Sequence, residues 1–240
     1  MISVCMTTFN GAKFIKEQLD SILIQLGADD EIIISDDGSR DDTINIISSY
    51  HDNRILLLRH QVEHGFVGNF ENALNHARGN VIFLADQDDI WRPQKVQVVL
   101  AALEDNDIVV HDAELIDSFG KSLGKNYYST LHNHSSFMAN LWESRFLGCC
   151  MAFKREVLMY CLPFPKGIVA HDYWIGMMGM TKYKSIFIND TLICYRRHGG
   201  NVSSSSGKSH NSLYYKIITK RMGLLFNILK VKMFSIKKMP

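Results

Sequence analysis

The sequence lacks the cysteine spacing and the long apolar runs that are typical of secreted and membrane-spanning proteins. Its 240 residues contain five Cys, of which Cys149 and Cys150 are adjacent, and no CxxC pair. This pattern favours reduced thiols over a disulfide framework or a zinc site. No window approaches the ~18–20 consecutive apolar residues that span a bilayer, and the first residues have no basic segment that would indicate a signal peptide. We therefore predict a cytoplasmic protein.

Acidic residues are missing from positions 191–240. Residues 1–190 hold all 25 Asp and Glu against 16 Lys and Arg, a net charge of −9, and residues 191–240 hold the other 10 basic residues. Nucleic acid phosphates would repel the acidic body, so no nucleic acid partner is expected. With 46% hydrophobic residues, the chain has enough apolar material for one large core. We expect one domain over residues 1–205 and a basic extension over residues 206–240.

Glycine-rich phosphate loops are also missing. No GxGxxG follows the first predicted strand, and GxxxxGK[ST] occurs nowhere in the chain. Such loops bind phosphates through backbone amides in dinucleotide-binding and P-loop proteins. A nucleotide bound by this chain would therefore need another partner for its diphosphate, and a metal ion held by carboxylates would serve.

Short apolar runs alternate with segments of helical periodicity over the first 90 residues. The runs that predict strands are 2–6, 31–35, 55–58 and 81–85. This alternation is typical of an α/β domain with a mostly parallel, Rossmann-like sheet flanked by helices. Farther on, the pattern predicts helices over 93–104, 136–142, 155–161 and 171–180, a hairpin near 113–124, and strands over 108–110, 146–153, 185–188 and 192–195.

Three polar turns follow predicted strands, at residues 7–11, 36–39 and 86–89. The carboxyl ends of parallel strands meet at one edge of a sheet, where the ligands of such folds bind. The third turn places Asp86, Asp88 and Asp89 within four residues, and like charges at this spacing raise one another's pKa. The cluster either caps the helix introduced by Pro93 or binds a hard divalent cation. The convergence of three polar turns favours a binding site.

Two later segments offer groups for catalysis or metal binding. Asp172 stands at the start of a predicted helix, where it is either an N-cap or a general base that takes a proton from an incoming hydroxyl. His198 lies between Arg197 and a Gly-Gly pair, and it is either a surface histidine or a metal ligand. Arg196 or Arg197 would then meet phosphate oxygens through charge-assisted hydrogen bonds. The residues alone leave both pairs of alternatives open.

Taken together, these segments resemble the family 2 glycosyltransferases of the GT-A fold. The motifs that carry the similarity are Thr7-Thr-Phe-Asn-Gly11, Asp36-Asp-Gly-Ser39, Asp86-Gln-Asp-Asp-Ile-Trp91, Gly148-Cys-Cys150, His171-Asp172 and Tyr195-Arg-Arg-His-Gly-Gly-Asn201. They occur in the family's order and cover about residues 1–205. The third and last motifs are similar to the bacterial branch that contains rhamnosyltransferases of cell-surface polysaccharide synthesis.

The resemblance implies a role for each matching residue in nucleotide-sugar binding. Thr7 and Phe9 would line the nucleotide pocket, Asp37 assisted by Asp36 would contact the base, and Asp86 would contact the ribose. The full set expected to bind the nucleotide sugar is Thr7, Phe9, Asp36, Asp37, Asp86 and Arg196.

The resemblance also assigns the metal and the catalytic base. Asp88 would hold Mg2+ or Mn2+ on the diphosphate, and His198 would lie near this metal. Asp89 would be left with the helix-capping role. Asp172 would be the general base of an inverting enzyme. The related branch often has Gln where this chain has Arg197, which leaves the role of Arg197 open.

The implied reaction moves a single sugar from a nucleoside diphosphate sugar, dTDP-rhamnose or a UDP-hexose, to a hydroxyl of a glycan or lipid-linked oligosaccharide. One alternative is a nucleotidyltransferase that makes the sugar nucleotide, which the missing triphosphate loop disfavours. A second alternative is an inactive, membrane-attached glycan-binding protein. The intact set of Asp86, Asp88, Asp172 and His198 argues against it.

The C-terminal tail, residues 208–240, combines eight basic residues with dense apolar positions. This composition predicts a basic amphipathic helix, which suits the surface of an anionic membrane. The alternative is a helix that packs on the core with its lysines outward. In the first case the protein would be peripheral on the inner face of the cell membrane.

Overall fold

The computed structural model describes residues 1–59, 65–130, 136–199 and 221–236. The chain order of the first half is β1 (Ile2–Thr8), α1 (Ile15–Leu23), β2 (Glu31–Asp36), α2 (Thr43–Ser48), β3 (Ile55–Arg59), α3 (Phe66–His76), β4 (Val81–Asp86), β5 (Ile90–Trp91) and α4 (Lys95–Glu104). The order of the second half is β6 (Ile108–Ile116), β7 (Ser122–Asn126), η1 (Tyr127–Thr130), α5 (Phe137–Trp142), η2 (Gly148–Cys150), β8 (Met151–Lys154), α6 (Arg155–Cys161), α7 (His171–Gly179), β9 (Ser185–Arg196) and α9 (Gly223–Ile236).

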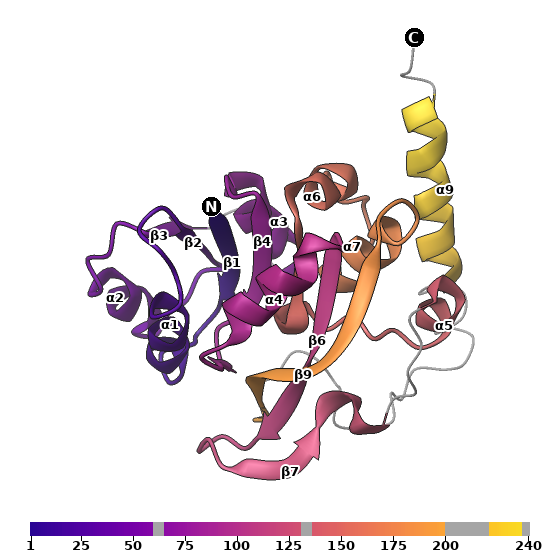
Figure 1. The fold of residues 1–240 in the computed structure, drawn as a ribbon. Coiled ribbons are helices and arrows are strands. Elements are labelled where there is room, and N and C mark those ends of the chain that lie inside the picture. Colours follow the sequence, from indigo (N-terminus) through magenta and orange to yellow (C-terminus); the bar gives the residue numbers. More distant parts are fainter. Residues whose placement is uncertain (60–64, 131–135, 200–220, 237–240) are drawn as a thin grey trace.

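The strands form one twisted sheet in the order β3-β2-β1-β4-β8-β6-β9-β5, with β7 paired to β6. Strands β3, β2, β1 and β4 are parallel, as the alternating pattern predicts. Helices α1, α2 and α4 cover one face, and α3, α6 and α7 lie behind the other (Figure 1). Because both faces are covered, the strands carry continuous apolar runs, and the three isoleucines of β2 at 32–34 are fully buried. The predicted α/β class is confirmed.

The second half of the sheet is more complex than the sequence pattern indicates. Strand β8 runs antiparallel to both β4 and β6. The predicted strand over 146–153 is wrong in its first half, because Gly148–Cys150 form a 3-10 turn. The two strands predicted over 185–188 and 192–195 are one continuous strand, β9, whose parallel register with β6 shifts around Asp112. The predicted hairpin is confirmed as the antiparallel β6–β7 pair.

Helix α9 stands at the edge of the molecule beside α5 (Figure 1). Its Leu224 and Ile228 are buried and belong to the main hydrophobic core. The expectation of a helical tail is therefore confirmed for residues 223–236, and one face of the helix does pack on the body. The predicted domain boundary at residue 205 lies outside the described residues.

Candidate active site

The three predicted polar turns lie together at one edge of the sheet. The parallel register pairs Thr7 of β1 with Asp86 of β4, and it pairs Thr8 of β1 with Asp36 of β2. The backbone N–H of Asp37 donates to the Thr8 carbonyl over 2.9 Å, which ties the ends of β1 and β2 beyond the last paired residues. The sheet register thus confirms the convergence predicted from the strand ends. Thr7 is half-buried and lies at this edge, paired with Asp86 of β4 and Ser35 of β2.

The loop after β1 is fixed to the loop after β2 by side-chain hydrogen bonds. The Asn10 amide donates to Ser39 Oγ, and the Arg40 amide donates to Asn10 Oδ1, both over 2.8 Å. Asn10 adopts a left-handed backbone with φ 48, a conformation that Asn tolerates. The Gly11 amide donates to Thr43 Oγ1 over 2.8 Å. These bonds make one rigid rim, on which the ring of Phe9 is 54% exposed.

Gln87 joins this rim to the acidic turn. Its Oε1 accepts from the Phe9 amide over 2.9 Å, and its Nε2 donates to the Phe9 carbonyl over 3.1 Å. A Cβ at Gly11 would lie 2.1 Å from Gln87 Oε1, so a larger residue there would displace the Gln87 amide from Phe9. The sequence reasoning assigned no role to Gln87. The available signal was its place between two carboxylates in a turn that follows a buried strand.

The two aspartates after β2 have different environments. Asp36 is buried, and its carboxylate accepts from the Thr8 hydroxyl and the Ser39 amide over 2.8 Å each and from the Gly38 amide over 3.0 Å. It therefore holds the turn in place. Asp37 is half-buried, and its Oδ2 accepts from the Gly65 amide at the start of α3 over 2.9 Å. Contact of either carboxylate with a nucleobase stays a prediction.

Two carboxylates of the third turn, Asp86 and Asp89, have a raised pKa. Burial raises the pKa of Asp86 to about 7, and the negative charges of Asp88 and Asp172 add to the shift. Burial also raises the pKa of Asp89 well above its usual range, with Asp88 and Asp86 contributing. The repulsion among carboxylates that the sequence predicts is therefore present in this cluster. A cation placed among these groups would relieve it.

Asp89 does not cap the following helix, and the predicted capping role is wrong. Helix α4 begins at Lys95 with Gln94 before it and has no side-chain cap. Asp89 is instead buried, and its Oδ1 accepts from the Arg196 amide at the end of β9 over 3.0 Å. The carboxylate thus holds the last strand against the acidic turn. The turn is tied to β9 because β5, two residues long, also pairs with that strand.

His198 and Arg196 meet Asp88, although they are more than 100 positions away in the sequence. His198 Nε2 lies 2.7 Å from Asp88 Oδ2, and metal binding by either residue stays a prediction. Arg196, 2% exposed, donates from Nε to the Asp88 carbonyl over 2.8 Å and from a terminal nitrogen to Glu17 Oε2 over 2.6 Å. Its guanidinium also lies 4.8 Å from the centre of the Phe14 ring.

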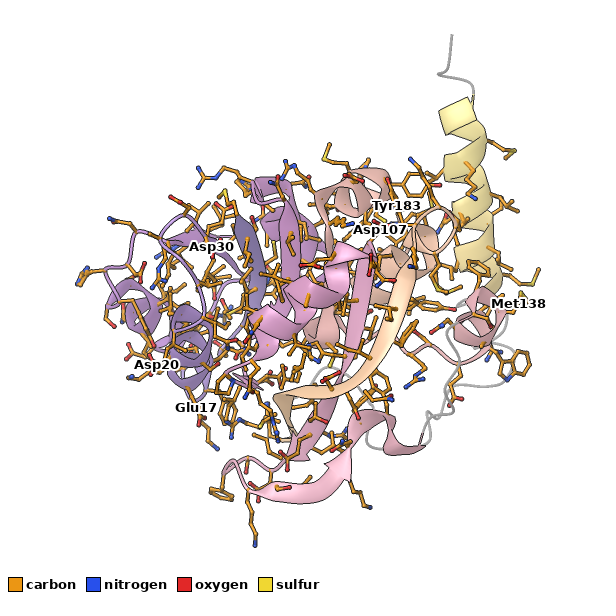
Figure 2. The ribbon with its side chains drawn as sticks, viewed as in Figure 1. Glu17, Asp20, Asp30, Asp107, Met138 and Tyr183 are labelled. Carbon is orange, nitrogen blue, oxygen red and sulfur yellow. The ribbon has the colours of Figure 1, made fainter. Side chains whose placement is uncertain are left out.

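These contacts give Arg196 a positioning role that the sequence reasoning did not include. The guanidinium joins α1, the acidic turn and the end of β9, and Figure 2 shows Glu17 at the end of α1 nearest that strand. The predicted contact of Arg196 with phosphate stays a prediction.

Asp172 lies in the first turn of α7 and is not its N-cap. Ala170 occupies the cap position, and Asp172 is the second residue of the helix. Its Oδ2 accepts from the Gly148 amide over 3.0 Å, and its Oδ1 accepts from the Tyr173 amide over 2.6 Å. Cys149, the residue after Gly148, has its thiol within 4.8 Å of an Asp86 carboxylate oxygen, so Asp172 and Asp86 flank the same turn. The predicted base is therefore near the predicted donor-binding edge.

His171, the residue before Asp172, is buried in the core. Its ring is buried, stacks on Phe70 at 3.7 Å between centroids, and has a pKa lowered to about 4 by burial. Within the described part of the chain, neither ring nitrogen has a hydrogen-bond partner. A Cβ at Gly148 would lie 3.0 Å from His171 Nε2, so this glycine lets α7 approach. The neutral imidazole positions the start of α7 by packing.

Lys95 places a positive charge beneath the acidic turn. The side chain is fully buried, Nζ donates to the Cys149 carbonyl over 2.8 Å, and it lies 4.0 Å from the centre of the Trp91 ring. Burial lowers the pKa of Lys95 to about 8, while the charges of Asp89 and Asp86 oppose this shift. The sequence reasoning missed Lys95, because a lysine in the first turn of a predicted helix normally faces solvent.

The donor set fits a hard divalent cation. Ligand atoms of Asp86, Asp89 and Cys149 lie within 4.8 Å of one another. Burial and nearby negative charge raise the pKa of Cys149 well above its usual range, so this thiol stays protonated and is a poor ligand. The remaining donors are carboxylate oxygens, which Mg2+ and Mn2+ prefer. Within this group these oxygens belong to Asp86 and Asp89, and the predicted role of Asp88 as the metal ligand stays a prediction.

The family follows from a comparison with known proteins. The sequence profile of Glycosyl transferase family 2 matches residues 3–162, two thirds of the chain. The chain belongs to this family. RfbG, a dTDP-rhamnosyl transferase of Shigella flexneri, is 28% identical over 92% of this glycosyltransferase and 79% of its own length. This similarity supports the predicted likeness to rhamnosyltransferases.

Two further matches concern acceptor chemistry and fold. WfgD of Escherichia coli, a UDP-Glc:alpha-D-GlcNAc-diphosphoundecaprenol beta-1,3-glucosyltransferase, is 26% identical over 87% of this chain and 81% of its own. The solved structure of S. aureus TarS 1–349 in complex with UDP-GlcNAc superposes with a TM-score of 0.68 at 18% identity, over 90% of this chain. The chain spans 64% of that structure, slightly less than two thirds. The match confirms a GT-A fold for this glycosyltransferase.

Replacing Asp86 by Asn should stabilise the metal-free glycosyltransferase at about pH 8. A carboxyl in the unfolded chain has a pKa of about 3.9, and the folded-state pKa of Asp86 is about 7. The stabilising effect of its proton is therefore complete below the lower value and is lost as the pH rises through the upper one. We expect a gain on the order of 2 kcal/mol in the free energy of unfolding, measured by thermal unfolding with a chelator present.

The gain should shrink at about pH 5, where the wild-type carboxyl is protonated. Asp29→Asn, at an exposed position on the loop before β2, is the matched control. An equal gain at both pH values would contradict the assigned pKa of Asp86.

Proposed function

We propose that this family 2 glycosyltransferase moves one sugar from a nucleoside diphosphate sugar to a hydroxyl of a glycan or lipid-linked oligosaccharide, with inversion at the anomeric carbon. The observation that carries the proposal is geometric: the Gly148 amide donates to Asp172, and the thiol of the next residue, Cys149, lies within 4.8 Å of an Asp86 carboxylate oxygen, at the edge where Asp88 meets His198. A base and an oxygen-rich cation site on one edge are the two parts that this transfer needs.

The donor would bind along the rim formed by the loops after β1 and β2. The exposed ring of Phe9 offers a surface for the nucleobase, and the carboxylate of Asp37 can accept from a base N–H or a hydroxyl. The hydrogen bonds between these loops fix the rim before the donor arrives, which lowers the entropy cost of binding. Thr7 and Asp86 follow on the adjacent strands, within the same edge.

The diphosphate would lie over the acidic turn. Asp88 would hold Mg2+ or Mn2+, Asp86 would contact the ribose, and His198 would orient the Asp88 carboxylate through their 2.7 Å contact. The ion, when bound, neutralises the negative charge that develops on the departing diphosphate. The buried Lys95 beneath the turn partly offsets the repulsion among the carboxylates, so the turn keeps its shape before a cation is present.

Asp172 would take the proton of the acceptor hydroxyl. Each of its oxygens accepts one backbone N–H, from Gly148 and Tyr173, which fixes the carboxylate and leaves a lone pair on each oxygen for the acceptor. As the proton moves to Asp172, the acceptor oxygen forms a bond to the anomeric carbon. The bond from that carbon to the diphosphate oxygen breaks on the opposite face, and its electron pair leaves with the diphosphate. Single displacement inverts the anomeric centre.

The donor sugars to test follow from the relatives. RfbG is a dTDP-rhamnosyl transferase, and WfgD uses UDP-Glc with a diphosphoundecaprenol-linked acceptor. We propose dTDP-rhamnose or a UDP-hexose as the donor and a lipid-linked oligosaccharide of cell-surface polysaccharide synthesis as the acceptor.

Nucleoside diphosphate binding should depend on a divalent cation. We expect UDP or dTDP to bind in the presence of Mn2+ and to lose roughly tenfold or more in affinity with a chelator, because the carboxylates then repel the diphosphate. Isothermal titration calorimetry with each nucleotide, followed by a hydrolysis screen of the corresponding sugar nucleotides, measures both steps. Mg2+ in place of Mn2+ tests which ion is preferred.

Two outcomes of these measurements would overturn the proposal. Release of pyrophosphate from a nucleoside triphosphate would identify a nucleotidyltransferase. Failure to bind any nucleoside diphosphate with Mn2+ would indicate a glycan-binding protein without activity.

A further inference from the structure

Helix α9 is apolar on two opposite faces. Leu224, Ile228 and Val231 recur at helical spacing and pack against the core. Phe226, Leu229 and Met233 recur at helical spacing on the other side, continued by Met222 directly before the helix, and all four are exposed. A helix that only packs on its own domain carries polar residues on its outer face. The outer face of α9 is therefore built for contact with something else.

The outer face of α9 continues onto helix α5. Met138 and Trp142 of α5 are 69% and 68% exposed, and Figure 2 shows Met138 beside the lower end of α9. Arg221 joins the two helices, because its guanidinium lies 4.2 Å from the centre of the Trp142 ring and donates to the carbonyls of Leu141 and Trp142. We call this surface the α5/α9 apolar face, and its members are Met138, Trp142, Met222, Phe226, Leu229 and Met233, each 57–69% exposed.

Basic residues accompany the α5/α9 apolar face. Arg221, Lys230 and Lys232 lie on or beside α9, and the chain has no acidic residue after position 190. Glu143, at the end of α5, is the one carboxylate of residues 136–145. Exposed large apolar side chains together with lysines and an arginine are the composition of helices that lie in a membrane interface. Trp142 suits that position, because its ring is amphipathic.

We propose that the α5/α9 apolar face rests on an anionic lipid bilayer. The apolar side chains would enter the boundary between headgroups and acyl chains, and Arg221, Lys230 and Lys232 would meet lipid phosphates. In residues 1–59, 65–130, 136–199 and 221–236, no helix has the length and apolar character of a bilayer-spanning segment. A second copy of the chain is a poorer occupant, because its own basic helix would be repelled.

The proposal deepens the proposed function, since a lipid-linked acceptor would be met at the same membrane. Only the meeting with a lipid-linked acceptor rests on the proposed function, because lipid binding itself needs neither donor nor acceptor. The two are therefore measured separately: vesicle binding without nucleotide, and nucleotide binding without vesicles.

Co-sedimentation of the full chain with vesicles tests the contact. We expect binding to vesicles of equal parts phosphatidylglycerol and phosphatidylcholine and weaker binding to phosphatidylcholine alone. The double variant Phe226→Ser, Leu229→Ser should lower binding roughly tenfold or more, because it removes two apolar side chains from the bilayer. Ile24→Ser is the matched control, since Ile24 is an exposed apolar residue at the end of α1, remote from α9.

A charge variant separates the two parts of the contact. Lys230→Glu, Lys232→Glu should abolish the preference for anionic vesicles, and salt should weaken wild-type binding. UDP or dTDP affinity measured without vesicles should stay unchanged in all variants, which shows that they fold. Equal vesicle binding by wild type and the Phe226–Leu229 variant would overturn the proposal. So would a concentration-dependent dimer, seen by analytical ultracentrifugation, that this variant dissociates.

Discussion

Replacing Asp172 by Asn should abolish sugar transfer and leave nucleotide binding intact. Asn keeps the shape of Asp and can still accept from the Gly148 amide, which Asp172 does over 3.0 Å. It cannot take the proton of the acceptor hydroxyl, and loss of a general base costs about 10²- to 10⁴-fold in rate. The transfer rate and the calorimetric affinity for UDP or dTDP with Mn2+ measure the two effects separately.

The position of the carboxylate makes this test specific. The negative charge of Asp172 helps to raise the pKa of Asp86, so Asp172→Asn should lower the pKa of Asp86 slightly. Cation binding should therefore be no weaker in this variant. Asp105→Asn, at the exposed end of α4, is the control with the same chemical change outside the site. Transfer near the wild-type rate in Asp172→Asn would show that another group is the base. Joint loss of transfer and of nucleotide binding would indicate a structural role.

The strand ends are what made the site predictable from sequence. A run such as residues 81–85 can be read as a buried strand because it is apolar throughout, and in a parallel sheet its carboxyl end lies at the same edge as that of β1. Polar residues placed directly after such runs must meet at one edge. That argument located Thr7, Asp36 and Asp86 together without any knowledge of side-chain contacts, and the observed register agrees with it.

The contacts between distant segments were beyond the same reasoning. Asp89 looked like a helix cap because Pro93 follows it, whereas its actual partner is the Arg196 amide, 107 positions later. Periodicity records which face of an element is buried and carries no information about which strand lies beside it. For the same reason, Arg196 was read as a phosphate ligand, and its bonds to Glu17 and the Asp88 carbonyl became visible only in three dimensions.

Lys95 shows a second limit of pattern reading. Charge is normally a sign of exposure, so a fully buried lysine is read as a surface residue. Its burial follows from the acidic turn above it, whose charges raise its pKa against the effect of burial. The burial of a lysine can be predicted only when the positions of its neighbouring carboxylates in space are known. For Lys95 these carboxylates lie in a different element, the turn after β4.

Replacing Asp88 by Asn should remove the dependence of nucleotide affinity on Mn2+. The change removes one negatively charged oxygen from the cation site. Without the cation, the departing diphosphate loses several kcal/mol of stabilisation, which lowers the transfer rate roughly a thousandfold. His198→Gln should have a smaller effect, about 10- to 100-fold, if His198 orients Asp88 through their 2.7 Å contact. Steady-state kinetics and calorimetry over a range of Mn2+ concentrations measure both variants.

A comparison of Asp88→Asn with Asp86→Asn decides which carboxylate holds the ion. The pKa of Asp86 is raised to about 7, so near neutral pH a cation must displace its proton, whereas the ordering of Asp88 comes from its contact with His198. If Asp88 is the main ligand, Asp86→Asn keeps Mn2+-dependent binding of UDP or dTDP and loses part of the affinity through the ribose. Retention of Mn2+ dependence in Asp88→Asn, with its loss in Asp86→Asn, would move the ion to Asp86 and leave His198 as a group that acts on the diphosphate alone.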